Sequence, residues 1–221
     1  WAVRKAVREQ RRDTVDIVKI FIDGEGVCEH ATQHELSFQD DEVAAIVDEA
    51  HRHGMRVACH SRSAAGVKQA VRSGVDFIAH ANFLDEEAAD MLYAARDHVY
   101  VAPSIIWELG LIEQCESLGL SSDWVKQRGY EEEVEASIKS VRMMLDRDIR
   151  LMVGGDFGIS VAPHGTYAKD LEVFVDTFGM SAEKALLCAT RDGGSAFDRS
   201  NMVGTLEAGK YADLLIIDGD P

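Results

Sequence analysis

Short apolar runs alternate with helical segments along most of this 221-residue chain. Each run is continuous and rich in β-branched residues, which is typical of strands covered on both faces in a parallel sheet. The segments between the runs place apolar residues at helical spacing, as residues 37–54 do before their closing Gly54. The alternation predicts five β/α units, with strands near 15–22, 55–60, 75–80, 99–104 and 150–155.

Parallel β/α units fit either an open doubly wound sheet or part of an eight-stranded barrel of the TIM type. An open sheet that binds a dinucleotide carries a glycine-rich loop after its first strand, and DGEG (23–26) supplies only two glycines of that pattern. Enzymes built on the barrel instead place catalytic residues at the carboxyl ends of several strands. We therefore expect an α/β fold in which the chain forms part of a (β/α)8 TIM barrel.

Composition argues against some classes of function. A hydrophobic content of 46% with 28% charged residues is that of a soluble globular protein. The net charge of −16 argues against nucleic acid as a partner, because a phosphate backbone requires a basic face. No apolar run is long enough to span a membrane, and the first residues lack a signal-peptide core, so we expect no membrane partner and a cytoplasmic location. The four cysteines have no CxxC spacing and are expected to be reduced.

Three of the five predicted strands lead into a residue that is able to bind a metal ion: His60, His80 and Asp156. In a parallel barrel the carboxyl ends of the strands meet on one face. Neutral imidazole and carboxylate are the usual ligands of zinc and related divalent ions. Each of these residues alone is more often an ordinary rim or turn residue. Together, at equivalent positions, they predict a site for one or two divalent ions, with zinc as the default.

Lys19 lies inside the apolar run of the first predicted strand, near its carboxyl end. A buried ammonium group is costly, and it would repel a divalent cation. Burial lowers the pKa of a lysine and frees a nucleophilic amine. Such an amine is able to take up CO₂ and become an anionic carbamate, a group that bridges two metal ions. The sequence is compatible with a carboxylated Lys19 as a further ligand.

The motifs that contain these residues resemble the amidohydrolase superfamily. They are VKIF with Lys19, HS with His60, HA with His80 and GGD with Asp156. The similarity is to the branch of imidazolonepropionase-like and prolidase-like hydrolases. It implies a carboxylated Lys19 on barrel strand four, with His60 and His80 as ligands on strands five and six. Asp156, on strand eight, would be both a ligand and the residue that transfers protons.

Longer segments extend the resemblance to nearly the whole chain. Residues 60–87 and 154–172 are similar to phenylurea and molinate hydrolases, and GTLEAGKYADLLIIDGDP (204–221) resembles the C-terminal signature of the family. The resemblance implies that 1–200 form about strands four to eight of a metal-dependent hydrolase barrel. It also implies that 201–221 supply one or more strands of a small β-sandwich. The family's HxH motif on strand one does not occur before Lys19, so the chain looks like a C-terminal fragment.

The resemblance implies a hydrolase that cleaves C–N bonds of a small amide, peptide, urea or carbamate through a metal-activated water. Asp156 would accept a proton from the water and pass it to the leaving amine. His164 and Tyr167, in the loop after the last strand, and Arg62, just after His60, are candidates for substrate binding. His164 is also a candidate for proton transfer. A homo-oligomer is compatible with the sequence.

Two alternatives stay open. One is a metal-dependent deaminase, or another non-amide hydrolase or lyase, on the same barrel. The other is that the chain as given is catalytically inactive. Without the HxH strand a metal site lacks two ligands, and an incomplete barrel has unpaired strand edges that favour aggregation.

Overall fold

Four parallel strands in the order β1-β2-β3-β4 form the central sheet of the protein. The computed structural model describes residues 1–28 and 32–219. The strands are β1 (Ile17–Phe21), β2 (Arg56–Ser63), β3 (Phe77–Phe83) and β4 (Tyr100–Ala102). A helix separates each strand from its parallel neighbour in the chain, so the predicted α/β architecture is confirmed.

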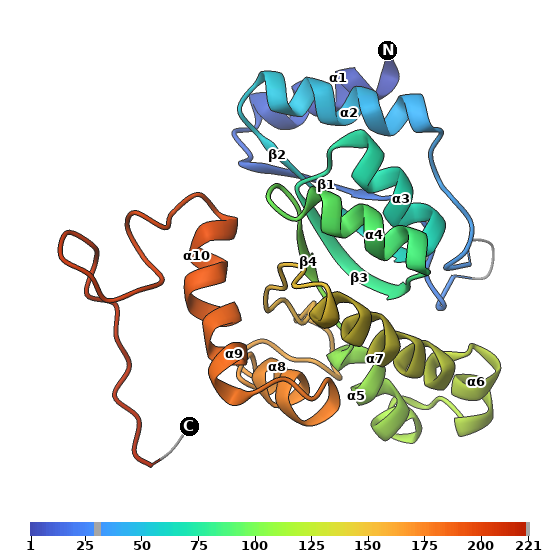
Figure 1. Cartoon of the computed structure of the whole chain (residues 1–221). Helices are drawn as coiled ribbons and strands as arrows, with labels where there is room; N and C mark the ends of the chain where they lie inside the picture. The colour runs from blue at the N-terminus through green and yellow to red at the C-terminus, as the bar shows by residue number, and fades with distance from the viewer. Residues whose placement is uncertain (29–31, 220–221) are drawn as a thin grey trace.

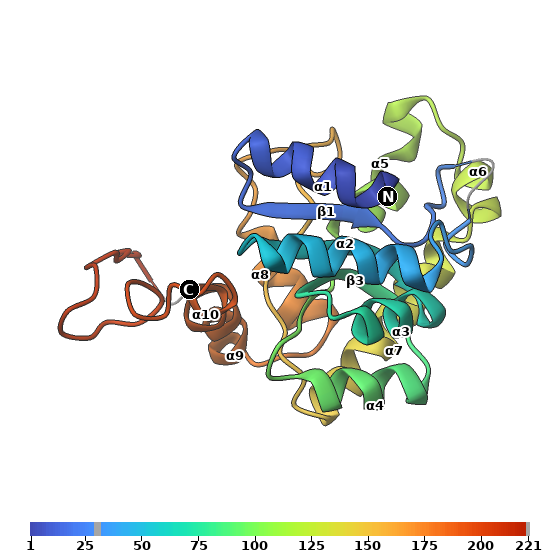
Figure 2. The ribbon, with the colours of Figure 1, turned by 90° about the horizontal axis from the view of Figure 1, so that it is seen from above.

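The first four helices form a layer beside the sheet (Figure 1 and Figure 2). They are α1 (Ala2–Arg12), α2 (Asp40–Arg52), α3 (Ala64–Ser73) and α4 (Glu86–Ala95). Helix α2 begins with a capping box between Gln39 and Glu42, which satisfies backbone N–H groups of its first turn. Helix α3 begins at the Ser63 side chain and ends at Gly74, whose left-handed φ of 81° favours glycine. Between helices and sheet lies the main apolar core.

The second half of the chain is mostly helical. Its helices are α5 (Ile106–Gln114), α6 (Ser122–Gln127), α7 (Tyr130–Asp146), α8 (Lys169–Glu172), α9 (Ala182–Leu187) and α10 (Gly193–Ala196). A 3₁₀ turn (Cys115–Leu118) follows α5, and π-helical turns (Val173–Thr177 and Cys188–Asp192) follow α8 and α9. Helix α7 packs against β3. Within the described residues, no helix combines the length and apolarity that crossing a bilayer requires.

The fifth predicted strand, 150–155, is wrong as a full strand. One parallel bridge joins Leu151 to Val101 of β4. The Met152 N–H donates to the Val101 carbonyl at 2.9 Å, and the Val101 N–H donates to the Arg150 carbonyl at 3.1 Å. Beyond this bridge two glycines lead to Asp156, whose left-handed φ of 53° turns the chain away from the sheet.

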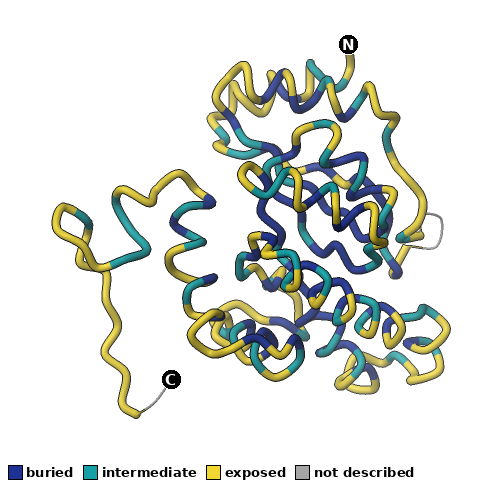
Figure 3. The backbone as a smooth tube through the Cα atoms, viewed as in Figure 1, coloured by how far each residue is buried: buried dark blue, intermediate teal, exposed yellow. Residues whose placement is uncertain are grey.

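Residues 201–219 form no strand, although the sequence predicts one at 212–218. The segment extends away from the body of the protein (Figure 1), and most of it is exposed (Figure 3). The side chains of Leu215 and Ile216 are 88% and 94% exposed. A strand needs a neighbouring strand for its backbone N–H and C=O groups. Among the described residues, none forms β-sheet pairing with 212–218. The assignment of 201–221 to a β-sandwich stays a prediction, and residues 220–221 lie outside the described residues.

Strand β1 is buried on one face only. Val18 and Ile20 point into the main core, whereas Lys19 and Phe21 are exposed on the opposite face. The expectation that Lys19 is buried is therefore wrong. The helix layer covers one face of this edge strand, and the described residues leave the other face at Lys19 open to solvent.

Candidate metal centre

His60 belongs to the open face of the sheet because of its register in β2. It pairs with Phe21 of β1 and with Ala79 of β3, so its side chain points to the same side as those of Phe21 and Lys19. Its ring stacks on the Phe21 ring, with centroids 4.7 Å apart. The side chain is nevertheless 1% exposed, because residues at the carboxyl ends of the strands enclose it.

His80 reaches the same place through an unusual backbone. It pairs with Ser61, so simple alternation along β3 would direct it to the helix-covered face. His80 and Ala81 instead adopt left-handed φ values of 79° and 55°. The His80 ring packs edge-on against His60, with centroids 4.5 Å apart. A left-handed conformation costs about 1–3 kcal/mol at a non-glycine residue, and such strain is concentrated at functional sites.

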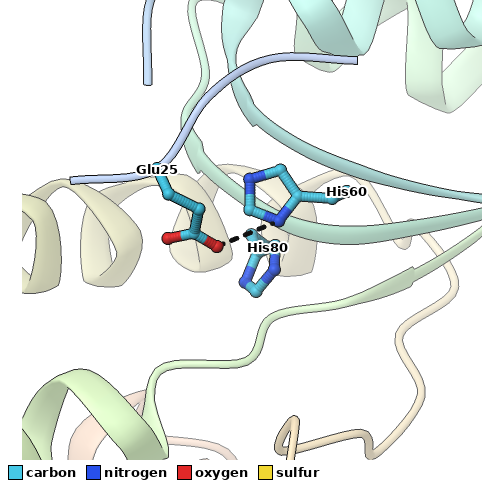
Figure 4. A group of neighbouring side chains, drawn as sticks. All are labelled: Glu25, His60 and His80. Carbon is cyan, nitrogen blue, oxygen red and sulfur yellow. Dashed lines mark ion pairs between the residues drawn. The ribbon is translucent and has the colours of Figure 1, made fainter. Parts of the chain in front are cut away.

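Glu25 completes a cluster with the two histidines (Figure 4). It lies in the loop after β1 and brings a carboxylate oxygen to 3.3 Å from His60 Nδ1. One ligand atom from each of Glu25, His60 and His80 lies within 4.8 Å of the other two. Two imidazoles and a carboxylate form a donor set that suits zinc and related divalent ions.

Each histidine directs one ring nitrogen to a backbone carbonyl and the other into the cluster. His60 Nε2 lies 3.2 Å from the Gly24 carbonyl, and His80 Nδ1 lies 3.3 Å from the Ser104 carbonyl. An N–H at each of these atoms leaves His60 Nδ1 and His80 Nε2 with free lone pairs. His80 Nε2 is buried without a hydrogen-bond partner among the described residues. Metal-binding histidines have this arrangement, so the residues present fit a divalent ion.

Both histidines are neutral at neutral pH. Burial, together with the positive charge of Arg62, lowers the pKa of His60 to about 3. Burial lowers the pKa of His80 well below its ordinary value, and the positive charge of Arg62 acts in the same direction. A metal ligand must be unprotonated, so these rings are available without competition from protons.

Asp156 lies at the edge of the cluster. Its carboxylate is 4.0 Å from His80 Nε2, and its side chain is 47% exposed. Lys19 occupies the same face of β1 as Phe21, with its Nζ 5.7 Å from the centroid of the Phe21 ring. The structure thus brings His60, His80 and Asp156 close together, and their role as metal ligands stays a prediction. Carboxylation of Lys19 stays a prediction.

His164 and Tyr167 lie together in the loop that follows Asp156. The Tyr167 hydroxyl is 3.1 Å from His164 Nδ1, and its ring packs edge-on against Phe157 at 5.1 Å. Tyr167 is 56% exposed. The pair is therefore accessible from solvent, and its role in substrate binding stays a prediction.

Arg62 has different surroundings from those expected of a substrate-binding residue. It is fully buried, and its guanidinium donates to the carboxylates of Glu25, Glu108 and Glu133. Trp107 lies beside it, with 5.4 Å between its ring centroid and Arg62 Cζ. Direct substrate binding by Arg62 stays a prediction.

Sequence reasoning missed Glu25 and its neighbour Asp23. Glu25 lies between two glycines in the loop after β1, four residues beyond Phe21, the residue that pairs with His60. Asp23 is fully buried and accepts hydrogen bonds from the backbone N–H groups of Arg62 and Ser63, each at 2.8 Å. It therefore ties the loop of Glu25 to the end of β2. The DGEG segment carries the signal, since Asp23 directly follows the apolar run and Glu25 lies two residues further on.

The chain is similar to several proteins of known name. The chain is 26% identical over 220 residues to ochratoxinase from Aspergillus niger, covering 99% of this chain and 44% of that protein. It is 22% identical over 195 residues to imidazolonepropionase from Rhizobium rhizogenes, covering 87% and 41%. A 5-methylthioadenosine/S-adenosylhomocysteine deaminase from Halalkalibacterium halodurans is 29% identical over 119 residues, or 50% of this chain and 26% of the deaminase. The chain spans less than half the length of these relatives.

Solved structures give the same result for the fold. A Xaa-Pro dipeptidase with methionine bound in its active site matches with a TM-score of 0.86 and 29% identity, covering 99% of this chain and 52% of that one. Molinate hydrolase matches with 0.71 and 21% identity, covering 100% and 50%, and phenylurea hydrolase B with 0.69 and 19%, covering 100% and 52%. These are TIM-barrel proteins of the amidohydrolase type, so the predicted partial barrel is confirmed.

The sequence profile described as the Amidohydrolase family matches residues 2–221, which is nearly the entire chain. The match includes β1, β2 and β3 with the cluster at their carboxyl ends, and it agrees with the resemblance seen in the motifs of His60, His80 and Asp156. The chain therefore belongs to the amidohydrolase family.

Proposed function

We propose that this chain carries the metal site of a hydrolase that cleaves C–N bonds in small amides, peptides, ureas or carbamates. The observation that carries the proposal is the cluster of Glu25, His60 and His80, whose ligand atoms lie within 4.8 Å of one another at the carboxyl ends of adjacent parallel strands. That edge is where enzymes of this architecture perform their chemistry.

The residues that would hold the ion are His60 through Nδ1, His80 through Nε2, and Glu25. Asp156 would join them, and so would Lys19 in a carboxylated form. We propose zinc, because its common protein ligands are imidazole and carboxylate groups. A divalent ion bound here supplies a Lewis acid that lowers the pKa of water and polarises a scissile carbonyl.

Asp156 is the residue best placed to move protons. It is the partly exposed carboxylate beside the two buried histidines, at 4.0 Å from His80 Nε2. We infer that it accepts a proton from the attacking water and delivers that proton to the departing amine nitrogen. The partial exposure of its side chain allows both water and substrate to reach it.

The adjacent loop would contribute to binding of the substrate. The Tyr167 hydroxyl and the His164 ring form a polar pair in the loop that follows Asp156. Such a pair would accept or donate hydrogen bonds to polar groups of a small substrate. We infer that His164 and Tyr167 orient the substrate, and that His164 is a second candidate for proton transfer.

The experiment that tests this function compares products with and without metal. The protein would be stripped with a chelator and reloaded with zinc, cobalt or manganese. Each preparation would be incubated with a panel of N-acyl amino acids, Xaa-Pro dipeptides, phenylureas and carbamates. We expect an amine and a carboxylic acid in equimolar amounts from amides and dipeptides, two amines with CO₂ from ureas, and an amine, an alcohol and CO₂ from carbamates. Activity is expected to be lost on chelation and restored by metal. Full turnover in the chelated protein would contradict metal dependence.

A deaminase is the second candidate, and the similarity over 119 residues to a deaminase from Halalkalibacterium halodurans favours it. The two reactions differ in their products. A deaminase releases ammonia from an amino-substituted ring and leaves the ring skeleton intact. Ammonia release from adenosine-type or aminopyrimidine substrates, without cleavage of amides or ureas, would replace the first proposal by the second.

A further inference from the structure

Arg62 is enclosed by three carboxylates that come from three other parts of the chain. Its Nη1 donates to Glu108 of α5 at 2.7 Å and also to Glu133 of α7. Its Nη2 donates to both oxygens of Glu25 in the loop after β1, at 3.2 and 3.1 Å. The guanidinium itself belongs to β2. The planar guanidinium donates hydrogen bonds in two directions at once, which a lysine ammonium on a flexible stem does not reproduce.

Glu25 stands between this guanidinium and His60. Among the described residues, the interactions of its carboxylate are with Arg62 and with His60 Nδ1, the latter at 3.3 Å. Gly24 and Gly26 flank Glu25, and glycine adds conformational freedom to the loop. The contact with Arg62 therefore fixes the direction of a side chain that its own backbone leaves free.

Burying this cluster of charged groups costs the protein free energy. One guanidinium faces three carboxyl groups where almost no water reaches, since Arg62, Glu108 and Glu133 are fully buried. Buried ion pairs are often no more stabilising than apolar side chains of similar volume. A role in stability alone therefore explains this arrangement poorly, whereas a role in holding a group at the site explains it directly.

We propose that Arg62 is a positioning residue of the metal centre: anchored on Glu108 and Glu133, it holds the Glu25 carboxylate in place beside His60. This inference rests on the proposed function, because it assigns Glu25 to the binding of the ion. It also gives Arg62 a role other than contact with the substrate. Glu108 of α5 and Glu133 of α7 hold the guanidinium in place. The guanidinium in turn holds Glu25, which would bind the ion.

The test measures zinc affinity of the chain by competition with a chromogenic chelator. Arg62→Lys keeps the charge and loses the planar guanidinium, and we expect it to weaken zinc binding by about 10- to 100-fold, the range seen when supporting residues of a metal site are removed. Glu25→Gln is expected to weaken binding at least as much. In the Glu25→Gln background, Arg62→Lys is expected to change the affinity by less than about twofold, because the two residues act in series.

A control comes from the same strand. Arg56 of β2 pairs with Asp198 at 2.7 Å, at the opposite end of the strand from His60. Arg56→Lys is expected to leave zinc affinity unchanged. If Arg62→Lys does not give folded protein by circular dichroism, Arg62→Lys/Glu133→Gln takes its place, because it removes a carboxylate that lysine would leave unpaired.

A second readout does not depend on metal. Hydrogen exchange of residues 22–28 in the metal-free chain is expected to be faster in Arg62→Lys than in the wild type, relative to α4 as an internal reference. Unchanged exchange in this segment, or equal losses of zinc affinity from Arg62→Lys with and without Glu25→Gln, would overturn the positioning role. Zinc binding that is insensitive to His60→Ala and His80→Ala would instead contradict the proposed function, and the exchange experiment would still decide the role of Arg62.

Discussion

Two parts of the candidate site differ in how firmly the fold holds them. The histidines of β2 and β3 are each 1% exposed. Asp156, His164 and Tyr167 belong to the irregular segment after the bridge at Leu151, where Asp156 is 47% exposed. The first part is built by neighbouring strands and buried contacts, so it forms a rigid binding site. The second is a loop on that support, as is usual for groups that must meet water and substrate. We therefore propose that the first part holds the ion and the second carries out the chemistry.

The largest effect is expected when a buried histidine of the first part is removed. We expect His80→Ala to weaken zinc binding by about 100-fold or more, because it removes a side chain that would bind the ion directly and not one that only supports a ligand. Isothermal titration calorimetry of the chain measures the effect. His51→Ala is the control, because His51 lies at the end of α2 and pairs with Asp76 at 2.8 Å. Equal affinities in the two variants would remove His80 from the site.

The exposed part is tested by Asp156→Asn. Proton transfer by a positioned side chain contributes about 10²- to 10⁴-fold to a rate, so we expect kcat of the natural protein to fall by at least about 100-fold. Zinc affinity is expected to fall by less than about tenfold, since the two buried histidines and Glu25 remain. The measurement is kcat for amine release beside zinc content by atomic absorption. Loss of zinc in proportion to activity would make Asp156 chiefly a ligand.

Close packing beneath the Glu25 loop is tested at Gly66 of α3. A Cβ atom there would lie 2.4 Å from both Asp23 Oδ2 and Ser61 Oγ, so the buried carboxylate must move. We expect Gly66→Ala to lower the free energy of unfolding by about 2–3 kcal/mol in urea denaturation. Gly119→Ala is the comparison, because its φ of 75° is left-handed but its Cβ meets no atom within 4 Å, so it should cost about 1 kcal/mol. Equal costs would show that the contact is unimportant.

Glu108 predicts a dependence of stability on pH. Burial, with the charge of Glu133 in support, raises its pKa from 4.5 to about 8 against the opposing effect of Arg62. Between those pH values the unfolded chain has released a proton that the folded chain keeps, so this group makes the free energy of unfolding fall as pH rises. The side chain of Glu108→Gln does not titrate, so the variant lacks this loss of stability. Its stability relative to the wild type should therefore rise by about 3 kcal/mol from pH 5 to pH 8.

Urea denaturation across that range measures the effect of Glu108→Gln. Glu113→Gln, which is exposed on the same helix, serves as the control and should stay within about 0.5 kcal/mol of the wild type at every pH. A constant difference between Glu108→Gln and the wild type would mean that Glu108 is already ionised in the folded chain at pH 5.

The smallest effect is expected in the exposed loop. Tyr167→Phe removes a hydroxyl that contacts His164 at 3.1 Å in a solvent-exposed pair. Because water replaces the lost hydrogen bond, we expect a change of less than about 0.5 kcal/mol in the free energy of unfolding. A thermal melt measures this. A loss of several kcal/mol would show that the loop is as firmly built as the histidine cluster.

Local patterns predicted those features that depend on neighbouring residues in sequence. Continuous apolar runs located β1 to β4, and helical spacing and caps located α2 and α3. His60, His80 and Asp156 were recognised because each follows an apolar run at the same point. The prediction of a strand at 150–155 was wrong, because its apolar residues are followed by two glycines and the chain leaves the sheet after one bridge.

The sequence by itself determined a parallel β/α body with two histidines at the ends of adjacent strands, because both features follow from short-range periodicity. Tertiary structure alone decided that left-handed backbone at His80 brings its ring beside His60, and that Lys19 is exposed. It also decided that Glu25 joins the cluster. Arg62 contacts Glu25 across 37 residues and Glu133 across 71. Contacts over such separations depend on how distant segments pack, and periodicity along the chain carries no record of them.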